Sequence, residues 1–126
     1  MDIRQAVQKE YAGLVSLRRQ FHTYPELSEQ EFPTMDTIEE ALKKDGIPCV
    51  RVPHGGVVGI IDSGREGYTV LLRADIDALP IQESPDNLTG PKICISKNKG
   101  VSHACGHDGH TATLLTKAQI LAGYTN

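Results

Sequence analysis

The chain has 126 residues, of which 39% are hydrophobic and 5% aromatic, and its net charge is −3. This length corresponds to about one small domain with a buried core. Basic and acidic side chains alternate in sign along the chain, which argues against a nucleic-acid-binding protein, since such proteins show a clustered basic excess. We also expect no membrane contact, because no apolar run is long enough to span a bilayer.

The first part of the chain predicts two helices. Apolar residues recur at spacings of three and four over residues 3–21, as on one face of a helix, and Pro25 should end this helix. Ser28 with Glu31 three residues later fits a capping box at the start of a second helix. Gly46 is the expected end of that helix. Its apolar face would consist of Phe32, Met35, Ile38 and Leu42.

Short β-prone runs follow these helices. Residues 48–52 and 57–61 are two such runs on either side of a Pro-His-Gly-Gly turn, and residues 62–67 predict another turn. Residues 68–72 are apolar and β-branched, which is typical of a strand covered on both faces. The polar stretch 82–102 predicts a long loop, and loops of that length are usually functional.

A third helix is expected after residue 110, and Gly123 should end it. Its apolar positions would be Ala112, Leu114, Leu115, Ala118, Leu121 and Ala122. Helices and strands in this order predict an α/β fold, in which a layered mixed sheet carries helices on both faces.

Residues 103–110 bring three imidazoles, one thiol and one carboxylate together in a short stretch: His103, Cys105, His107, Asp108 and His110. Thiol and imidazole groups are ligands that borderline-soft divalent metals prefer. The glycine between Cys105 and His107 lets the backbone bend, so both side chains can turn toward one ion. Asp108 is expected to accept a ring N–H from a ligating histidine. A single histidine at a helix start is more often a solvated or capping residue, so the metal prediction depends on the cluster.

Asp75 and Asp77 stand where a central strand should end, which is where ligands bind in open α/β sheets. Residues two apart on a strand point to the same side. The two carboxylates therefore either share a cation or hold a ligand, or they cap backbone N–H groups in a turn. The pattern alone leaves both alternatives open.

The three cysteines, Cys49, Cys94 and Cys105, form a poor disulfide framework because their number is odd and their spacing scattered. A reducing cytoplasm is therefore the expected location. We expect Cys49 and Cys94 to be small buried residues in strands.

Three separated segments resemble the N-acyl-amino-acid amidohydrolases: residues 22–27 (HTYPEL) with Glu31, residues 72–81 (LRADIDALPI) and residues 103–110 (HACGHDGH). That family includes hippurate hydrolases, auxin-conjugate hydrolases and N-acetyl-diaminopimelate deacetylases, within the aminoacylase and carboxypeptidase metallopeptidase clan. The resemblance implies a site for two divalent metals, manganese or zinc, that hydrolyses the amide of a small N-acyl amino acid.

The resemblance also implies roles for particular residues. Cys105 and His107 match metal ligands, with the cysteine bridging the two ions, and Asp77 matches the aspartate that supports the catalytic site. Much of the wider clan has a ligating histidine at the position of Asp75, so no ligand role is transferred to Asp75. His110 matches a recurrent family histidine without an assigned direct role.

Family members carry further parts beyond this region: a glutamate pair that includes the general base, two more histidine ligands, and an inserted dimerisation domain. None of these follows Asn126. Residues 1–126 are therefore expected to be the N-terminal part of an incomplete catalytic domain, inactive alone, from an enzyme that is a homo-oligomer when whole. The alternative is a non-catalytic fragment that at most binds a divalent metal. A redox protein fits poorly, because no second cysteine lies near Cys105.

An incomplete sheet would expose an edge and an apolar face, which promote pairing and aggregation. We therefore expect the isolated chain to self-associate.

Overall fold

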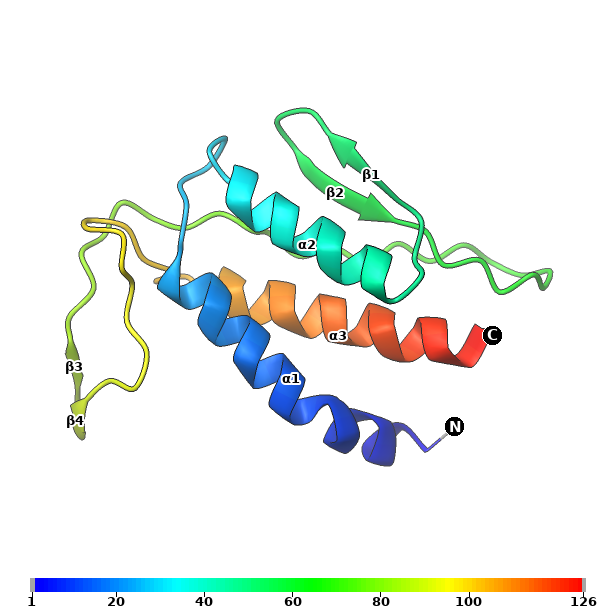
Figure 1. The fold of residues 1–126 in the computed structure, drawn as a ribbon, viewed down its shortest axis with the longest axis horizontal. Coiled ribbons are helices and arrows are strands. Elements are labelled where there is room, and N and C mark those ends of the chain that lie inside the picture. Colours follow the sequence, from blue (N-terminus) through cyan, green and yellow to red (C-terminus); the bar gives the residue numbers. More distant parts are fainter. Residues whose placement is uncertain (1, 126) are drawn as a thin grey trace.

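The computed structural model describes residues 2–125, in which three helices pack together, one small sheet lies against them and a second stands apart at one end (Figure 1). The helices are α1 (Ile3–Thr23), α2 (Phe32–Lys44) and α3 (His107–Thr125). All three expected helices are thus confirmed, although α3 continues past Gly123, which does not end it.

Side chains and backbone geometry define the helix ends. The Asp2 carboxylate accepts a hydrogen bond from the Gln5 backbone N–H and caps α1. The prediction of a capping box from Ser28 and Glu31 is wrong, because Glu31 itself precedes the first residue of α2 and its side chain makes no capping hydrogen bond. The Glu26 carboxylate instead accepts from the Thr34 N–H at 2.9 Å, which satisfies one free donor of the first turn of α2.

The core lies where α1 and α2 meet α3. Its buried members are Phe21, Ile38, Leu42, Ile47, Ala112, Leu115 and Ala122. Full burial of a side chain the size of leucine contributes roughly 1.5–3 kcal/mol. These contacts fix α3, and so they fix the position of the 103–110 cluster at its start.

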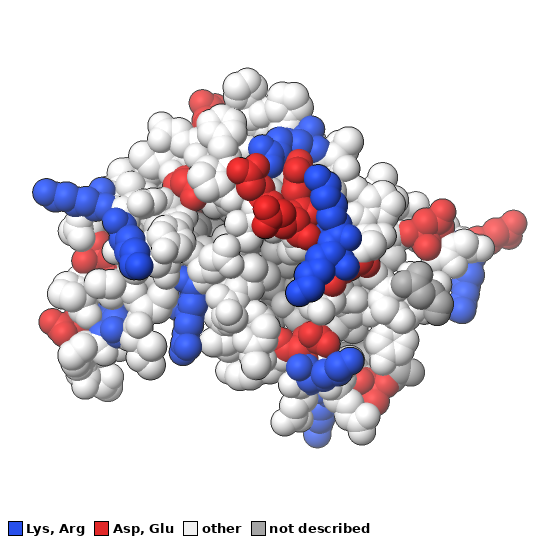
Figure 2. Space-filling view, in the orientation of Figure 1, with Lys and Arg blue, Asp and Glu red and all other residues white. Residues whose placement is uncertain are grey.

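The strands form two antiparallel pairs. They are β1 (Cys49–Val52) with β2 (Gly56–Gly59), and β3 (Asp86–Asn87) with β4 (Gly90–Pro91). The β1–β2 hairpin lies against α2 so closely that a Cβ on Gly59 would come within 3.2 Å of Leu42. On the face shown in Figure 2 acidic and basic groups gather over this region, where Arg51 of β1 pairs with Glu39 of α2 at 3.0 Å.

The α/β class is confirmed. Within residues 2–125, however, each sheet has two strands, and α2 packs against the β1–β2 sheet. The strand expected at residues 68–72 is not formed. Tyr68, Val70 and Leu71 have exposed fractions of 103%, 76% and 83%. A strand needs a neighbour for its backbone hydrogen bonds, and β-propensity cannot supply that neighbour.

The loop 82–102 is anchored to the end of α1. The Lys97 N–H donates to the Thr23 carbonyl at 2.8 Å, and the Asn98 side-chain amide donates to the Pro25 carbonyl at 2.6 Å. Cys49 lies in β1 as expected, whereas Cys94 lies in this loop and not in a strand, and both are half-buried. None of the helices described is long and apolar enough to span a membrane.

The exposed apolar segment 68–72 generates a prediction about self-association. The wild-type chain should form dimers or larger species at micromolar concentration, because an exposed apolar segment with β-propensity can pair with copies of itself. Val70→Lys should shift the population toward monomer in sedimentation equilibrium. Leu88→Lys, at an exposed apolar position in the β3–β4 turn, is the control and should leave association unchanged. A wild-type chain that sediments as a monomer would contradict the prediction.

Candidate functional site

The segment 77–79 joins the three motifs that are far apart in the sequence. The Ala78 N–H donates to the Glu26 carbonyl at 2.8 Å, beside a parallel bridge between Leu27 and Ala78. On the other side, Leu79 and Ser102 exchange two backbone hydrogen bonds of 3.0 Å each. The site therefore forms where residues 22–27, 72–81 and 103–110 lie side by side.

The structure brings His107 and Asp77 together. Nδ1 of His107 lies 3.0 Å from Oδ1 of Asp77 and 2.9 Å from the Asp77 carbonyl oxygen, so the Nδ1–H donates to this residue. The other nitrogen, Nε2, is left as an acceptor, and it lies 3.9 Å from Oδ2 of Asp75. A histidine held through one nitrogen by a carboxylate is the usual arrangement of a metal-ligating imidazole.

Asp75 is an ionised carboxylate beside the Asp77–His107 pair. A 2.7 Å hydrogen bond from Arg73, together with its charge, holds the pKa of the Asp75 carboxyl below its ordinary value, and His107 and His110 add to the effect. The side chain pairs with Arg73, so the backbone-capping alternative is not observed for Asp75. Its backbone carbonyl accepts from the Thr111 hydroxyl at 3.0 Å, which ties α3 to this segment.

Cys105 lies exposed in the turn that leads into α3. The turn bends at Gly106, whose φ of +83° is in the left-handed region that favours glycine. His110 lies one turn further along α3, with its ring centroid 5.8 Å from that of His107. The expected sharp bend between Cys105 and His107 is therefore present.

These donors match the chemistry of a borderline-soft metal but cover only part of a coordination shell. Cys105 offers a thiol and His107 a free Nε2, a pair that suits several divalent ions. Among residues 2–125, no group of three or more His, Cys, Asp and Glu side chains is placed to hold a metal ion. Further ligands would have to come from outside the described residues.

Asp108 does not bond to a candidate metal ligand, so the expectation that it would is wrong. Its side chain is buried, with the whole residue 1% exposed, and it accepts from Nδ1 of His22 at 2.7 Å and from Nε of Arg18 at 2.9 Å. Consecutive helical residues point about 100° apart, so His107 faces Asp77 while Asp108 faces α1. Asp77 performs the supporting contact that we assigned to Asp108.

His22 extends this contact into a buried ion cluster, defined as Arg18, His22, Glu83, Lys92 and Asp108. Nε2 of His22 lies 2.8 Å from Oε1 of Glu83, and Nζ of Lys92 lies 3.1 Å from the same oxygen. Burial alone would raise the pKa of Glu83, but hydrogen bonds from the Ser96 N–H, His22 and Lys92 outweigh it and lower that pKa. The sequence analysis missed this cluster; the signal was the i, i+4 spacing of Arg18 and His22 on one helix face.

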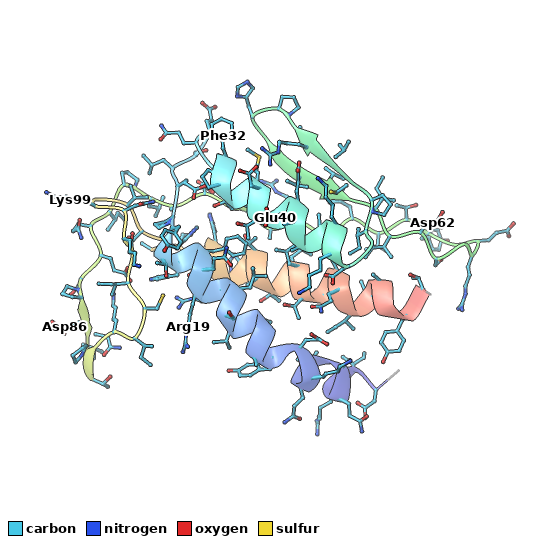
Figure 3. The ribbon with its side chains drawn as sticks, in the orientation of Figure 1. Arg19, Phe32, Glu40, Asp62, Asp86 and Lys99 are labelled. Atoms are coloured by element: carbon cyan, nitrogen blue, oxygen red, sulfur yellow. The ribbon has the colours of Figure 1, made fainter. Side chains whose placement is uncertain are left out.

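His103 is buried beside the ion cluster, at 6% exposure. Within the described part of the chain, neither of its ring nitrogens has a hydrogen-bond partner. Burial lowers the pKa of His103, so the ring is neutral near pH 7. With His22 and Glu83 it lines an open cavity of about 720 Å³ between α1 and the 82–102 loop. Figure 3 shows Arg19, also in this lining, projecting from α1 beside that loop.

Comparison with known proteins identifies the relatives of this arrangement. Residues 71–126, which include the Asp75–Asp77 segment and the 103–110 cluster, match peptidase family M20/M25/M40. The chain is related to the M20 family. The resemblance found from the three motifs is thereby confirmed.

Two curated relatives show how far the M20 similarity extends. The N-acetyl-L-cysteine deacetylase of Bacillus subtilis is 48% identical over 109 residues, which are 86% of this chain and 25% of that protein. The N-acyl-L-amino acid amidohydrolase of Geobacillus stearothermophilus is 39% identical over 122 residues, 96% of this chain and 32% of that protein. The chain thus spans between a quarter and a third of the length of these relatives.

A solved M20 structure has the same fold over the shared part. The YxeP protein of Bacillus subtilis, described as a dinuclear metal binding peptidase from the M20 family, superposes with a TM-score of 0.82 at 38% identity. The match covers 93% of this chain and 32% of that chain. The similarity therefore extends over most of the fold that carries the candidate site.

The depressed pKa of Glu83 generates a prediction about acid stability. A carboxyl with a lowered folded-state pKa stabilises the fold above its unfolded value, near 4.5, and loses this contribution as pH falls through the folded value. Glu83→Gln should lower the free energy of unfolding at pH 7 by about 1–3 kcal/mol. Below pH 4.5 the free energy of unfolding of Glu83→Gln should also fall less steeply with pH than that of the wild type.

Urea unfolding at pH 7 and pH 3.5 measures both effects. Glu66→Gln, in an exposed turn, is the matched control and should follow the wild type. If Glu83→Gln lowered the free energy of unfolding equally at both pH values, the charge of Glu83 would contribute nothing to stability.

Proposed function

We propose that this chain is the N-terminal part of the catalytic domain of a metal-dependent amidohydrolase that cleaves the amide bond of N-acyl amino acids. The observation that carries the proposal is the Asp77–His107 pair, which leaves Nε2 of His107 free, with Cys105 exposed two residues earlier. The names of the relatives support the substrate class, since they include a deacetylase and an N-acyl-L-amino acid amidohydrolase.

In this proposal Cys105 and His107 are metal ligands and Asp77 is the supporting catalytic-site residue. Asp77 fixes the proton of His107 on Nδ1 and so leaves Nε2, which lies 3.9 Å from Oδ2 of Asp75, free to bind a metal. Cys105 and His107 would hold divalent metal, manganese or zinc, which when bound would supply Lewis-acid polarisation of the amide carbonyl. The thiol ligand requires a reduced cysteine, so we place the protein in the cytoplasm.

The remaining machinery belongs to the longer protein in this proposal. The general base, the other ligands and a dimerisation domain would lie in the two thirds or more of the relatives' length that this chain does not span. The whole enzyme would then be a homo-oligomer that acts on a small molecule. Residues 1–126 alone would not turn over substrate.

A second candidate is a non-catalytic fragment that at most binds a divalent metal. The observation that favours it is the incomplete ligand set, since no group of three donors is placed for a metal within residues 2–125. The two candidates differ in whether the chain can complete an active site when the remaining parts are supplied.

A chimeric enzyme separates the two candidates. This chain would replace the matching segment of the Bacillus subtilis N-acetyl-L-cysteine deacetylase, to which it is 48% identical, and hydrolysis of N-acyl amino acids would be measured with Mn²⁺ or Zn²⁺. We expect turnover, and a loss in kcat/KM of about 100-fold or more for Cys105→Ala, which corresponds to at least roughly 2.7 kcal/mol.

Two further variants complete the chimera test. Asp77→Asn keeps an oxygen acceptor but removes the charge, so it should weaken metal affinity about 10–100-fold. Cys94→Ala, in the loop, is the matched control for Cys105→Ala and should stay within about twofold of the parent chimera. A folded, metal-loaded chimera without turnover, or full activity in Cys105→Ala, would refute the amidohydrolase proposal.

A further inference from the structure

His22 joins two carboxylates that come from different parts of the chain. Its Nδ1 lies 2.7 Å from Asp108 in the first turn of α3, and its Nε2 lies 2.8 Å from Glu83 in the loop that follows the 72–81 motif. We propose that His22 is a positioning residue, whose doubly protonated ring clamps the start of α3 to the 82–102 loop and so holds the Cys105–His107 turn in place.

Each ring nitrogen of His22 faces a carboxylate oxygen, an arrangement that favours a proton on both. A neutral imidazole has one donor and one acceptor nitrogen, whereas the imidazolium has two donors. If Nδ1 carried no proton, its lone pair would face an oxygen of Asp108 at 2.7 Å. Nη2 of Arg18 lies farther from Nδ1, at 3.2 Å, and Nε of Arg18 already bonds to the same oxygen of Asp108 at 2.9 Å. The Asp108 carboxylate therefore faces two cations.

Charge compensation alone does not require His22. Asp108 has Arg18 as a second cation, and Glu83 has Lys92. Of the two carboxylates, Arg18 of α1 pairs with Asp108 and not with Glu83, while Lys92 lies in the same loop as Glu83. His22 is the member of the cluster that contacts both carboxylates, so its specific contribution is the connection between α3 and the loop.

This connection acts on the candidate ligands from the side opposite Asp77. Asp108 directly follows His107, whose ring is held by Asp77 on the other side of the helix start. The amides of Gly109 and His110 bond to the Gly106 carbonyl, so the turn that carries Cys105 and the first turn of α3 move together. The inference deepens the proposed metal site and rests on it for its functional meaning.

The charge on His22 can be tested in the wild-type chain without any variant. Two-bond ¹H–¹⁵N correlation spectra at pH 7.5 report whether each imidazole nitrogen carries a proton. We expect both nitrogens of His22 to be protonated, because both face carboxylate oxygens. A single-tautomer neutral pattern for His22 would overturn the proposal.

The positioning role is tested by hydrogen exchange in His22→Gln, because the glutamine amide carries its donors on a single nitrogen and its other arm is an acceptor oxygen, whereas His22 faces the two carboxylates with two separate nitrogens. The Gly109 and His110 amides should exchange at least about tenfold faster, because local opening of the first turn becomes easier. The Ile47 amide, which bonds to the Leu42 carbonyl away from the cluster, should change less than about twofold. Equal acceleration at all three amides, or none, would overturn the role.

Two controls complete the experiment. His54→Asn replaces an exposed histidine whose φ of +58° asparagine tolerates, and it should leave all three amides unchanged. If His22→Gln fails to fold, Glu83→Gln breaks the same bridge from the loop side and should accelerate the same two amides. These readouts need no metal, so a metal-loaded chimera without turnover would refute the proposed function while leaving the positioning result intact.

Discussion

Backbone hydrogen bonds of residues 75–79 hold the candidate site together. This extended segment bonds to residue 26 on one side and to residue 102 on the other, and its carbonyls at 75 and 77 accept from Thr111 and His107 of α3. An extended backbone offers donors and acceptors to both sides, which a helix cannot do because its own turns use them. Three motifs separated by up to 80 residues of sequence therefore meet along one short segment.

The start of α3 is fixed from two directions. Asp77 and the carbonyl of Asp75 hold it from the segment side, and the buried ion cluster holds it through Asp108 from the α1 side. The turn that carries Cys105 lies at the N-terminal end of α3. The apolar packing of α1 on α3 and the paired charges at the start of α3 thus both fix the positions of Cys105 and His107.

Local patterns predicted the helices and the β1–β2 hairpin, and the order of the three motifs, through the resemblance to the amidohydrolases, indicated that Asp77 supports the site of Cys105 and His107. These features depend on apolar periodicity, turn residues and motif order, all of which are contained in short stretches. The failures involve partners distant in sequence. Residues 68–72 have strand propensity but no neighbouring strand, Glu26 replaces Ser28 as the side chain that caps α2, and Asp108 bonds to a residue 86 positions away. No local pattern specifies such pairings.

The central claim is that Cys105 and His107 bind the same divalent ion. X-ray absorption at the zinc edge, measured on the Zn²⁺-loaded chain, tests it most directly because it reports ligand types and distances. The account predicts one sulfur at about 2.3 Å and imidazole nitrogen at about 2.0–2.1 Å, with the remaining ligands oxygen. The sulfur contribution should disappear in Cys105→Ser. A shell of oxygen ligands alone in the wild-type chain, or a sulfur signal that survives in Cys105→Ser, would contradict the account.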